Sequence, residues 1–441
     1  MIGEHQVKAI TQLITDLIPS CEVGCTTGEM DNSPNTKVAK SRTGDLVGMQ
    51  ICDSMMKLWL QINARRRYIF TITRDTGFTK AEKQIVCALL EVCRNLPIED
   101  TNLVDFTQKS ISSRFTIPYF LVAYFMRGAN PSRLWSSVAG LVSLQQLSYK
   151  KYEGSACTSG FLCLKSISNT IPNRIVGIDG YTYEPFSEPI ALTGDYFEKP
   201  LSYRYVDGKN SFYVVDNHGQ IQGVIRNNAP KEFDIIDRCT YKHIETLKSI
   251  PGFRWIAHSG IHNDVIVHTK KRVVFQWDQN IWRNREISAI TDLLISFGVV
   301  EKFANELVGV LVTLSEMRMG ALILITKEEK LPDTIGDIDT SELGLELKKT
   351  VKGRSFDYLK KTNAILGLLA SDGMTSFNTS GKLMNSGVII DLTTANPEVK
   401  ISGGGRSQAA CAASSYGMAI KVSEDGPITL YEKGKKLLEW R

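Results

Sequence analysis

The stretch Gly320-Ala321-Leu322-Ile323-Leu324-Ile325 places five consecutive apolar residues between a glycine and the polar pair Thr326-Lys327. A short, continuous apolar run with polar borders is typical of a strand that is covered on both faces. We therefore expect residues 321–325 to form a central, buried strand of a sheet.

The sequence on either side of this strand alternates between helical and extended patterns. Such alternation predicts an α/β domain over residues 286–441, a mixed sheet flanked by helices. The expected elements are helices from Ile287 to about Met319, from Phe356 to Ala370 and after Gly403, a turn at Gly381, and strands at Gly387–Asp391, Met418–Val422 and Ile428–Tyr431.

The region upstream of this domain divides into two segments. Residues 1–195 indicate a mixed but mainly helical region, with helices from His5 to Ile18 and from Thr79, where Thr79 and Glu82 form a capping-box pattern. Residues 26–44 are polar and suggest a loop. Residues 196–285 alternate with a period of two, which predicts a β-rich middle segment of mostly antiparallel strands. The region before the α/β domain is thus expected to be α+β.

The composition is typical of a folded globular protein. A chain of 441 residues suggests two to four domains, and 43% hydrophobic with 22% charged residues is typical of a folded globular chain. The apolar run at residues 117–126 is too short to cross a bilayer, and the odd number of cysteines, 9, fits no disulfide framework. We expect a cytoplasmic protein that does not bind membranes. The net charge of +5 divides into +7 for residues 1–285 and −2 for residues 286–441. Its local basic runs, Arg65–Arg67 and Lys270–Arg272, are typical of solvated strand or helix ends, so no nucleic-acid surface is evident.

Two residue pairs have spacings that metal sites use. Cys21 and Cys25 are separated by three residues, and so are His258 and His262. Neither pair has further ligands at a recognisable spacing, and Ser259-Gly260 favours a turn between the histidines. The sequence identifies no metal ligands.

The segment Gly403-Gly404-Gly405-Arg406 is a candidate anion site. Backbone N–H groups at the start of a helix point toward an oxyanion, glycines let a phosphate approach the main chain, and an arginine adds a bidentate donor. The spacing matches neither the P-loop nor the dinucleotide-binding fingerprint. A purely structural loop is the alternative.

Four segments occur in the order of a known family. They are Gly320-Ala321-Leu322-Ile323-Leu324-Ile325, Asp372-Gly373-Met374, Gly404-Gly405-Arg406-Ser407-Gln408-Ala409-Ala410 and Val422-Ser423-Glu424-Asp425-Gly426-Pro427-Ile428. Together they resemble the diadenylate cyclase (DisA-type nucleotide-binding) family, over residues 286–441 only. The resemblance implies a diadenylate cyclase-like fold. It also implies an enzyme that joins two ATP molecules into cyclic di-AMP across a face-to-face pair of subunits, with Mg²⁺ or Mn²⁺.

The resemblance also implies which residues would act. Asp372 matches the aspartate near the attacking ribose hydroxyl and would be catalytic in an active enzyme. The expected nucleotide- and phosphate-binding residues are Gly373, Met374, Gly403, Gly404, Gly405, Arg406, Ser407 and Gln408.

Several of these positions depart from the family pattern. Met374 replaces an alanine, Gly405 a threonine, Ser407 the histidine of the Arg-His-Arg signature and Gln408 its second arginine. Losing one phosphate- or metal-binding group commonly costs on the order of 10²-fold in rate, whereas hydrogen-bond donors still support binding. Two hypotheses follow. The first is a nucleotide sensor, binding ATP or a cyclic dinucleotide, with impaired cyclisation. The second is an active diadenylate cyclase. A homo-oligomer fits either one.

Overall fold

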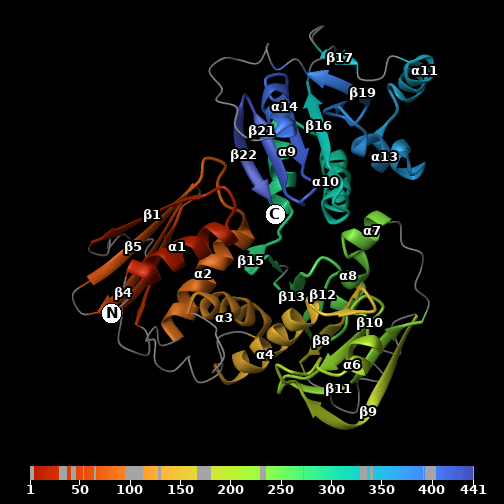
Figure 1. Cartoon of the computed structure of the whole chain (residues 1–441). Helices are drawn as coiled ribbons and strands as arrows, with labels where there is room; N and C mark the ends of the chain where they lie inside the picture. Colours follow the sequence, from red (N-terminus) through yellow and green to blue (C-terminus); the bar gives the residue numbers. More distant parts are fainter. Residues whose placement is uncertain are drawn as a thin grey trace. The chain divides into compact units, whose positions relative to one another are not determined.

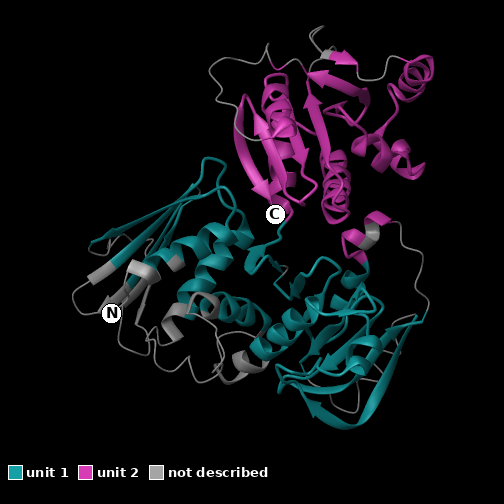
Figure 2. Cartoon of the chain, in the orientation of Figure 1, with its two compact units in different colours: residues 1–232, 243–286 teal, residues 233–242, 287–441 magenta. Residues whose placement is uncertain are grey.

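The chain folds into two compact units of mixed α/β structure. The computed structural model describes residues 4–28, 37–40, 46–52, 54–63, 66–95, 113–127, 131–165, 180–228, 235–271, 273–327, 335–337, 341–390, 392 and 404–440. Unit 1 comprises residues 1–232 and 243–286, and unit 2 comprises residues 233–242 and 287–441 (Figure 2). Each unit is described by itself.

Unit 1 begins with a five-stranded antiparallel sheet in the order β1-β5-β4-β3-β2. Helices α1 and α2 pack on it (Figure 1). They bury the apolar sides that their periodicity predicts. The elements are α1 (Glu4–Leu17), β1 (Glu22–Thr27), β2 (Lys37–Lys40), β3 (Leu46–Ile51), β4 (Met55–Asn63), β5 (Arg66–Thr73) and α2 (Lys80–Asn95).

Residues 1–195 contain long strands as well as helices. β4 and β5 form a long antiparallel pair whose alternate residues, such as Leu58 and Phe70, are fully buried. The loop predicted over residues 26–44 is wrong in part. β1 extends to Thr27 and residues 37–40 form β2, while residues 29–36 and 41–45 lie outside the described residues.

Unit 1 continues with an eight-stranded sheet in the order β15-β14-β13-β12-β8-β10-β11-β9. Its pairs are antiparallel except for the parallel pair of β10 and β8. Helices α3 (Ser113–Arg127) and α4 (Pro131–Ser148) pack on β12 and β13. The remaining elements are β6 (Lys151–Tyr152), β7 (Ser155–Ala156), β8 (Gly160–Leu164), β9 (Tyr181–Ala191), α6 (Pro200–Arg204), β10 (Ser211–Val215), β11 (Gln220–Asn227), α8 (Lys242–Lys248), β12 (Phe253–Ser259), β13 (Val265–Thr269), β14 (Val274–Asp278) and β15 (Ile281–Asn284).

The β-rich middle of the chain is confirmed, with one correction. The sheet does not start at residue 196, because β8 and β9 precede that point and pair with β10 and β11. β13 ends at Thr269 and β14 begins at Val274. Asp216 closes the turn between β10 and β11, where its Oδ1 accepts hydrogen bonds from the backbone N–H groups of His218 and Gln220.

A buried ion pair anchors the start of α2. Both guanidinium ends of Arg74 donate to the Glu82 carboxylate, at 2.7 and 2.6 Å, and both side chains are buried. The capping box is confirmed: the Thr79 N–H donates to Glu82 Oε2, and the Glu82 N–H donates to Thr79 Oγ1. The Thr79 hydroxyl also donates to Glu286, 207 residues away, at the end of unit 1.

Unit 2 contains a seven-stranded mixed sheet in the order β17-β19-β18-β16-β20-β21-β22. β16 (Ala321–Thr326) is buried at every position and lies in the middle, as its apolar run predicts. The other elements are α7 (Ile235–Cys239), α9 (Ser288–Phe297), α10 (Glu301–Glu316), β17 (Ile335–Asp337), α11 (Glu342–Val351), α12 (Phe356–Lys361), α13 (Ala364–Ala370), β18 (Met374–Asn378), β19 (Leu383–Ile390), α14 (Gly405–Ala413), β20 (Met418–Val422), β21 (Ile428–Glu432) and β22 (Lys435–Trp440).

Both faces of this sheet are covered by helices. Ile323 and Ile325 of β16 join a core with α9, α10, α12 and α13. Leu322 and Leu324 point the other way and pack against alanines of α14. Because each face of β16 packs against a hydrophobic layer, residues 321–325 are all apolar.

Two helices expected in unit 2 are interrupted. The pattern from Ile287 to Met319 forms α9 and α10, because Gly298 ends α9 in the left-handed conformation with φ of 104°. The pattern from Phe356 to Ala370 forms α12 and α13, with Asn363 at φ of 55° between them. The turn at Gly381 has φ of 82° and is confirmed.

We expect Glu82→Ala to lower the free energy of unfolding by about 3–5 kcal/mol, because it leaves the buried Arg74 guanidinium without its carboxylate. Urea denaturation followed by tryptophan fluorescence measures the change. Glu245→Ala is the matched control in the same unit, since that carboxylate is 68% exposed in its pair with Lys248. The control should cost less than about 1 kcal/mol. Equal losses in the two variants would contradict the importance of the buried pair.

Candidate functional site

The register of β16 brings the sequence-predicted site segments to one end of the unit 2 sheet. β16 runs parallel to β18, with Leu322 opposite Met374, and antiparallel to β20, with Ala321 opposite Val422. Gly320, the Asp372-Gly373 turn and the residues after Val422 therefore lie at the same end. Asp372 is exposed there.

The helix predicted after Gly403 is α14, and its first turn is open. Gly404 is the N-cap residue and Gly405 the first helical residue. Among the described residues, no atom lies within 4 Å of a Cβ added at either position, and Gly404 has φ of −72°, which any residue adopts. Neither the backbone conformation nor packing against these residues requires glycine here, whereas a ligand approaching the main chain would. Gly403 lies outside the described residues.

Arg406 lies across the start of β16. Its Nη1 donates to Glu424 Oε1 at 2.6 Å, in an ion pair whose side chains are 42% and 68% exposed. A Cβ on Gly320 would overlap Arg406 Nη1 and lie 2.7 Å from its Cζ. The glycine before β16 therefore leaves the space that the guanidinium occupies. Among the described residues, no hydrogen bond or ion pair joins Arg406 to Asp372.

Ser407 belongs to a polar cluster on the sheet face beneath α14. Lys421 Nζ on β20 donates to Ser407 Oγ at 2.9 Å. The Tyr431 hydroxyl on β21 also hydrogen-bonds to Ser407; burial raises the pKa of this tyrosine, and the hydrogen bond opposes that rise. Arg406, Ser407 and Lys421 together place two cations and a hydroxyl at the first turn of the helix.

The remaining predicted residues have different surroundings. Gly373 has φ of 88°, so this turn requires glycine. The backbone N–H of Gln408, which is half-buried, donates to the Gly404 carbonyl. Met374 was predicted to bind nucleotide, but its side chain is fully buried and packs with Leu322 in the core under α14.

Sequence reasoning missed Lys421 and the pairing of Glu424 with Arg406. Lys421 is the one charged residue in β20, Met418–Val422, an otherwise apolar strand. A charge inside a buried strand is expensive unless it is paired, so its position is a signal that sequence reading can use. The Arg406 partner is 18 residues away and becomes evident only with the fold.

The residues at this end do not form a ready metal site. Among the described residues, no group of three or more His, Cys, Asp or Glu side chains could hold a metal ion. Ser407 stands where the resemblance expects a histidine near the metal, and it accepts a hydrogen bond from a lysine. A cation so close disfavours a second one. In unit 1, His258 is buried on β12 and stacks on His268 at 5.6 Å, and does not form a helical pair with His262.

Comparison with known proteins shows no family. No family model matches the chain, and no curated protein matches it. One solved structure, titled as that of a hypothetical membrane spanning protein from Bacillus cereus, aligns at 18% identity and a TM-score of 0.26, over 34% of this chain and 72% of that one. A similarity at this level carries no argument about function. In the part of the chain that the structure describes, no helix is long and apolar enough to cross a membrane.

The surroundings of Gly320 and Gly417 in unit 2 predict different losses of stability when an alanine replaces each glycine. At Gly320 an added Cβ meets the end of the flexible Arg406 side chain, whereas at Gly417 it would overlap the backbone oxygen of Ile325. We expect Gly320→Ala to cost less than about 1 kcal/mol of stability while displacing Arg406, and Gly417→Ala to cost about 2 kcal/mol or more, because overpacking strains a core. Thermal unfolding measures both. A large loss for Gly320→Ala would show that Arg406 is held rigidly.

Proposed function

We propose that unit 2 is a nucleotide-binding sensor module of diadenylate cyclase-like fold, which binds an adenine nucleotide or a cyclic dinucleotide with little or no cyclisation. The observation that carries the proposal is the hydrogen bond from Lys421 to Ser407 at the open first turn of α14, beside Arg406. This arrangement offers positive charge and backbone N–H groups to a phosphate without a metal ion.

The charges favour an anion at this position. The amino end of α14 carries the positive end of the helix dipole, and Lys421 and Arg406 add two formal positive charges nearby. Glu424 offsets one of them. An ion pair between side chains as exposed as these is worth about 0.2–1 kcal/mol, so a phosphate can replace Glu424 on Arg406 at small cost.

The same residues argue against efficient cyclisation. Joining two ATP molecules requires charge neutralisation while a ribose hydroxyl attacks an α-phosphate. Ser407 and Gln408 stand in place of the histidine and second arginine of the family signature. The Ser407 hydroxyl already accepts a hydrogen bond from Lys421. These residues support binding better than phosphoryl-group chemistry.

One observation supports the alternative of an active diadenylate cyclase. Asp372, the catalytic candidate, is exposed at the same end of the sheet as Arg406 and is followed by a glycine in the left-handed conformation. In that case Asp372 would act on the ribose hydroxyl and Mg²⁺ or Mn²⁺ would be needed. Nucleotide binding without formation of cyclic di-AMP would distinguish the sensor from the active cyclase.

We expect ATP or cyclic di-AMP to raise the unfolding temperature of the full chain, with and without Mg²⁺. A ligand at 100 times its dissociation constant stabilises a folded state by about 2.7 kcal/mol. Adenosine, which lacks phosphate, is the control and should give a much smaller shift. If neither nucleotide shifts the transition in either condition, the sensor and the cyclase functions are both wrong.

Arg406→Ala should weaken nucleotide binding by about 1.5 kcal/mol, about tenfold in the dissociation constant, because it removes a charged hydrogen bond to phosphate. Isothermal titration of the full chain measures the change. Lys361→Ala is the matched control: this exposed lysine pairs with Asp357 on α12, and its removal should leave binding unchanged. An unchanged affinity in Arg406→Ala would contradict the placement of the phosphate.

Incubation of the unmodified protein with ATP and Mg²⁺ or Mn²⁺ should yield little or no cyclic di-AMP, detected by chromatography and mass spectrometry. The missing signature residues predict this result, since each such loss costs on the order of 10²-fold in rate. Sustained multiple-turnover synthesis, abolished by Asp372→Asn, would establish the cyclase instead.

A further inference from the structure

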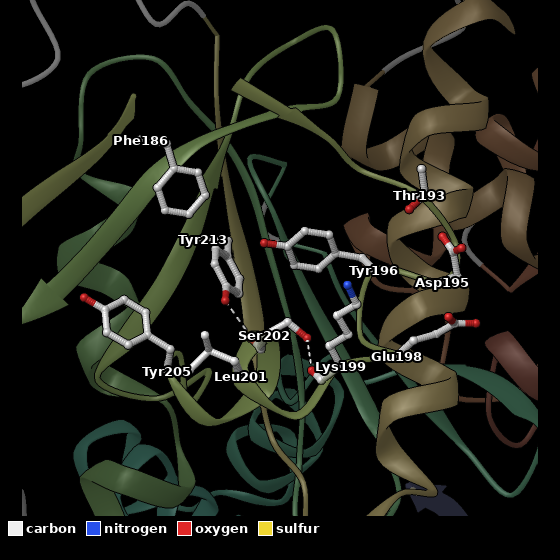
Figure 3. A pocket seen from close by; sticks show the side chains of 10 residues that line it. All are labelled: Phe186, Thr193, Asp195, Tyr196, Glu198, Lys199, Leu201, Ser202, Tyr205 and Tyr213. Atoms are coloured by element: carbon white, nitrogen blue, oxygen red, sulfur yellow. Dashed lines mark hydrogen bonds between the residues drawn. The ribbon is translucent and has the colours of Figure 1, made fainter. Parts of the chain in front are cut away.

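Unit 1 contains a pocket that the proposed function does not use. It lies beside β9, β10 and α6 and has a volume of about 690 Å³, within the range of pockets that hold small molecules (Figure 3). Its lining residues are Phe186, Thr193, Asp195, Tyr196, Glu198, Lys199, Leu201, Ser202, Tyr205 and Tyr213.

Aromatic rings form much of the pocket wall. Phe186, Tyr196 and Tyr213 lie around its upper part and Tyr205 lies at the lower left in Figure 3. Tyr213 is buried, and its hydroxyl donates to the Ser202 carbonyl at 2.7 Å, which fixes the ring. The ring centroids of Tyr196 and Phe186 lie 5.2 and 6.3 Å from that of Tyr213. The wall therefore presents several fixed aromatic surfaces.

The charged residues lie toward one side of the pocket. Asp195, Glu198 and Lys199 line it on the side away from Phe186 and Tyr205 (Figure 3). A hydrogen bond from Thr193 lowers the pKa of the Asp195 carboxyl, so this group is ionised at neutral pH. The formal charges of the lining residues sum to −1, which favours a cationic ligand.

Neighbouring aromatic rings already contact cations. The Arg226 guanidinium lies 4.8 Å from the centroid of Tyr205, and that of Arg204 lies 4.5 Å from the centroid of Tyr152. The faces of aromatic rings attract cations through their quadrupole. The same attraction is available to a ligand on the ring of Tyr196, which is half-buried, whereas Tyr213 is buried behind it and supports that ring.

The rim also exposes apolar surface. Leu201 is 75% exposed and Tyr205 is 48% exposed, both at the pocket. Apolar side chains this open gain most from a ligand with an apolar body. We propose that this pocket binds a small organic cation, an amine or quaternary ammonium compound with an aromatic or apolar body.

Three probes with one scaffold and different charges test the proposal on the full chain: phenethylamine, 2-phenylethanol and 3-phenylpropionate. We expect the protonated amine to bind about tenfold more tightly than the carboxylate, with the alcohol between them. Saturation-transfer NMR and thermal shift at millimolar concentrations measure binding. Tightest binding by the carboxylate, or no saturable binding of the amine, would overturn the proposal.

Variants of exposed lining residues locate the binding. The double variant Asp195→Asn, Glu198→Gln should abolish the preference for the amine over the alcohol, and Leu201→Ala should weaken all three probes. Ile261→Ala is the matched control, since this residue is 56% exposed in the same unit and does not line the pocket. Equal effects of Leu201→Ala and Ile261→Ala would place the probes elsewhere. Nucleotide binding by unit 2 should not change in any of these variants.

Discussion

The candidate site depends on the register of β16 with both of its neighbours, β18 and β20. This strand is buried on both faces, so a shift of one residue against either neighbour would exchange its two hydrophobic layers. The register with β18 places the Asp372 turn beside the start of β16. The register with β20 places Glu424, which follows β20, at the same end. Core packing therefore brings three segments that are distant in sequence to one end of the sheet.

Much of unit 2 could be predicted from sequence because its signals are local. β16 and β20 are short apolar runs with clear borders, and α14 follows a run of glycines. The capping box at Thr79 and Glu82 is equally local, and the structure contains both of its hydrogen bonds. In each case the residues that decide the conformation lie within a few positions of one another.

The features that sequence reading missed depend on distant partners or on single residues that override a pattern. Gly298 and Asn363 divide two helical patterns that look continuous by periodicity. The five-stranded sheet of unit 1 was not predicted, and one of its pairs joins β1 to β5, with Glu22 opposite Thr73, residues that are far apart in the sequence. The partner of Arg406 and the role of Gly320 required the fold, since nothing local specifies which carboxylate or glycine lies opposite a given guanidinium.

Helix α7 has a consequence for how the two units are joined. Its residues belong to unit 2, where Ile236 enters the core and α7 contacts α10, yet the chain on both sides of residues 233–242 belongs to unit 1. The polypeptide therefore passes between the units three times, at residues 232–233, 242–243 and 286–287. A single cut at residue 286 would not yield an intact unit 2, because part of its core would remain with the other fragment. Unit 2 is a discontinuous domain, which the backbone joins to unit 1 at three points.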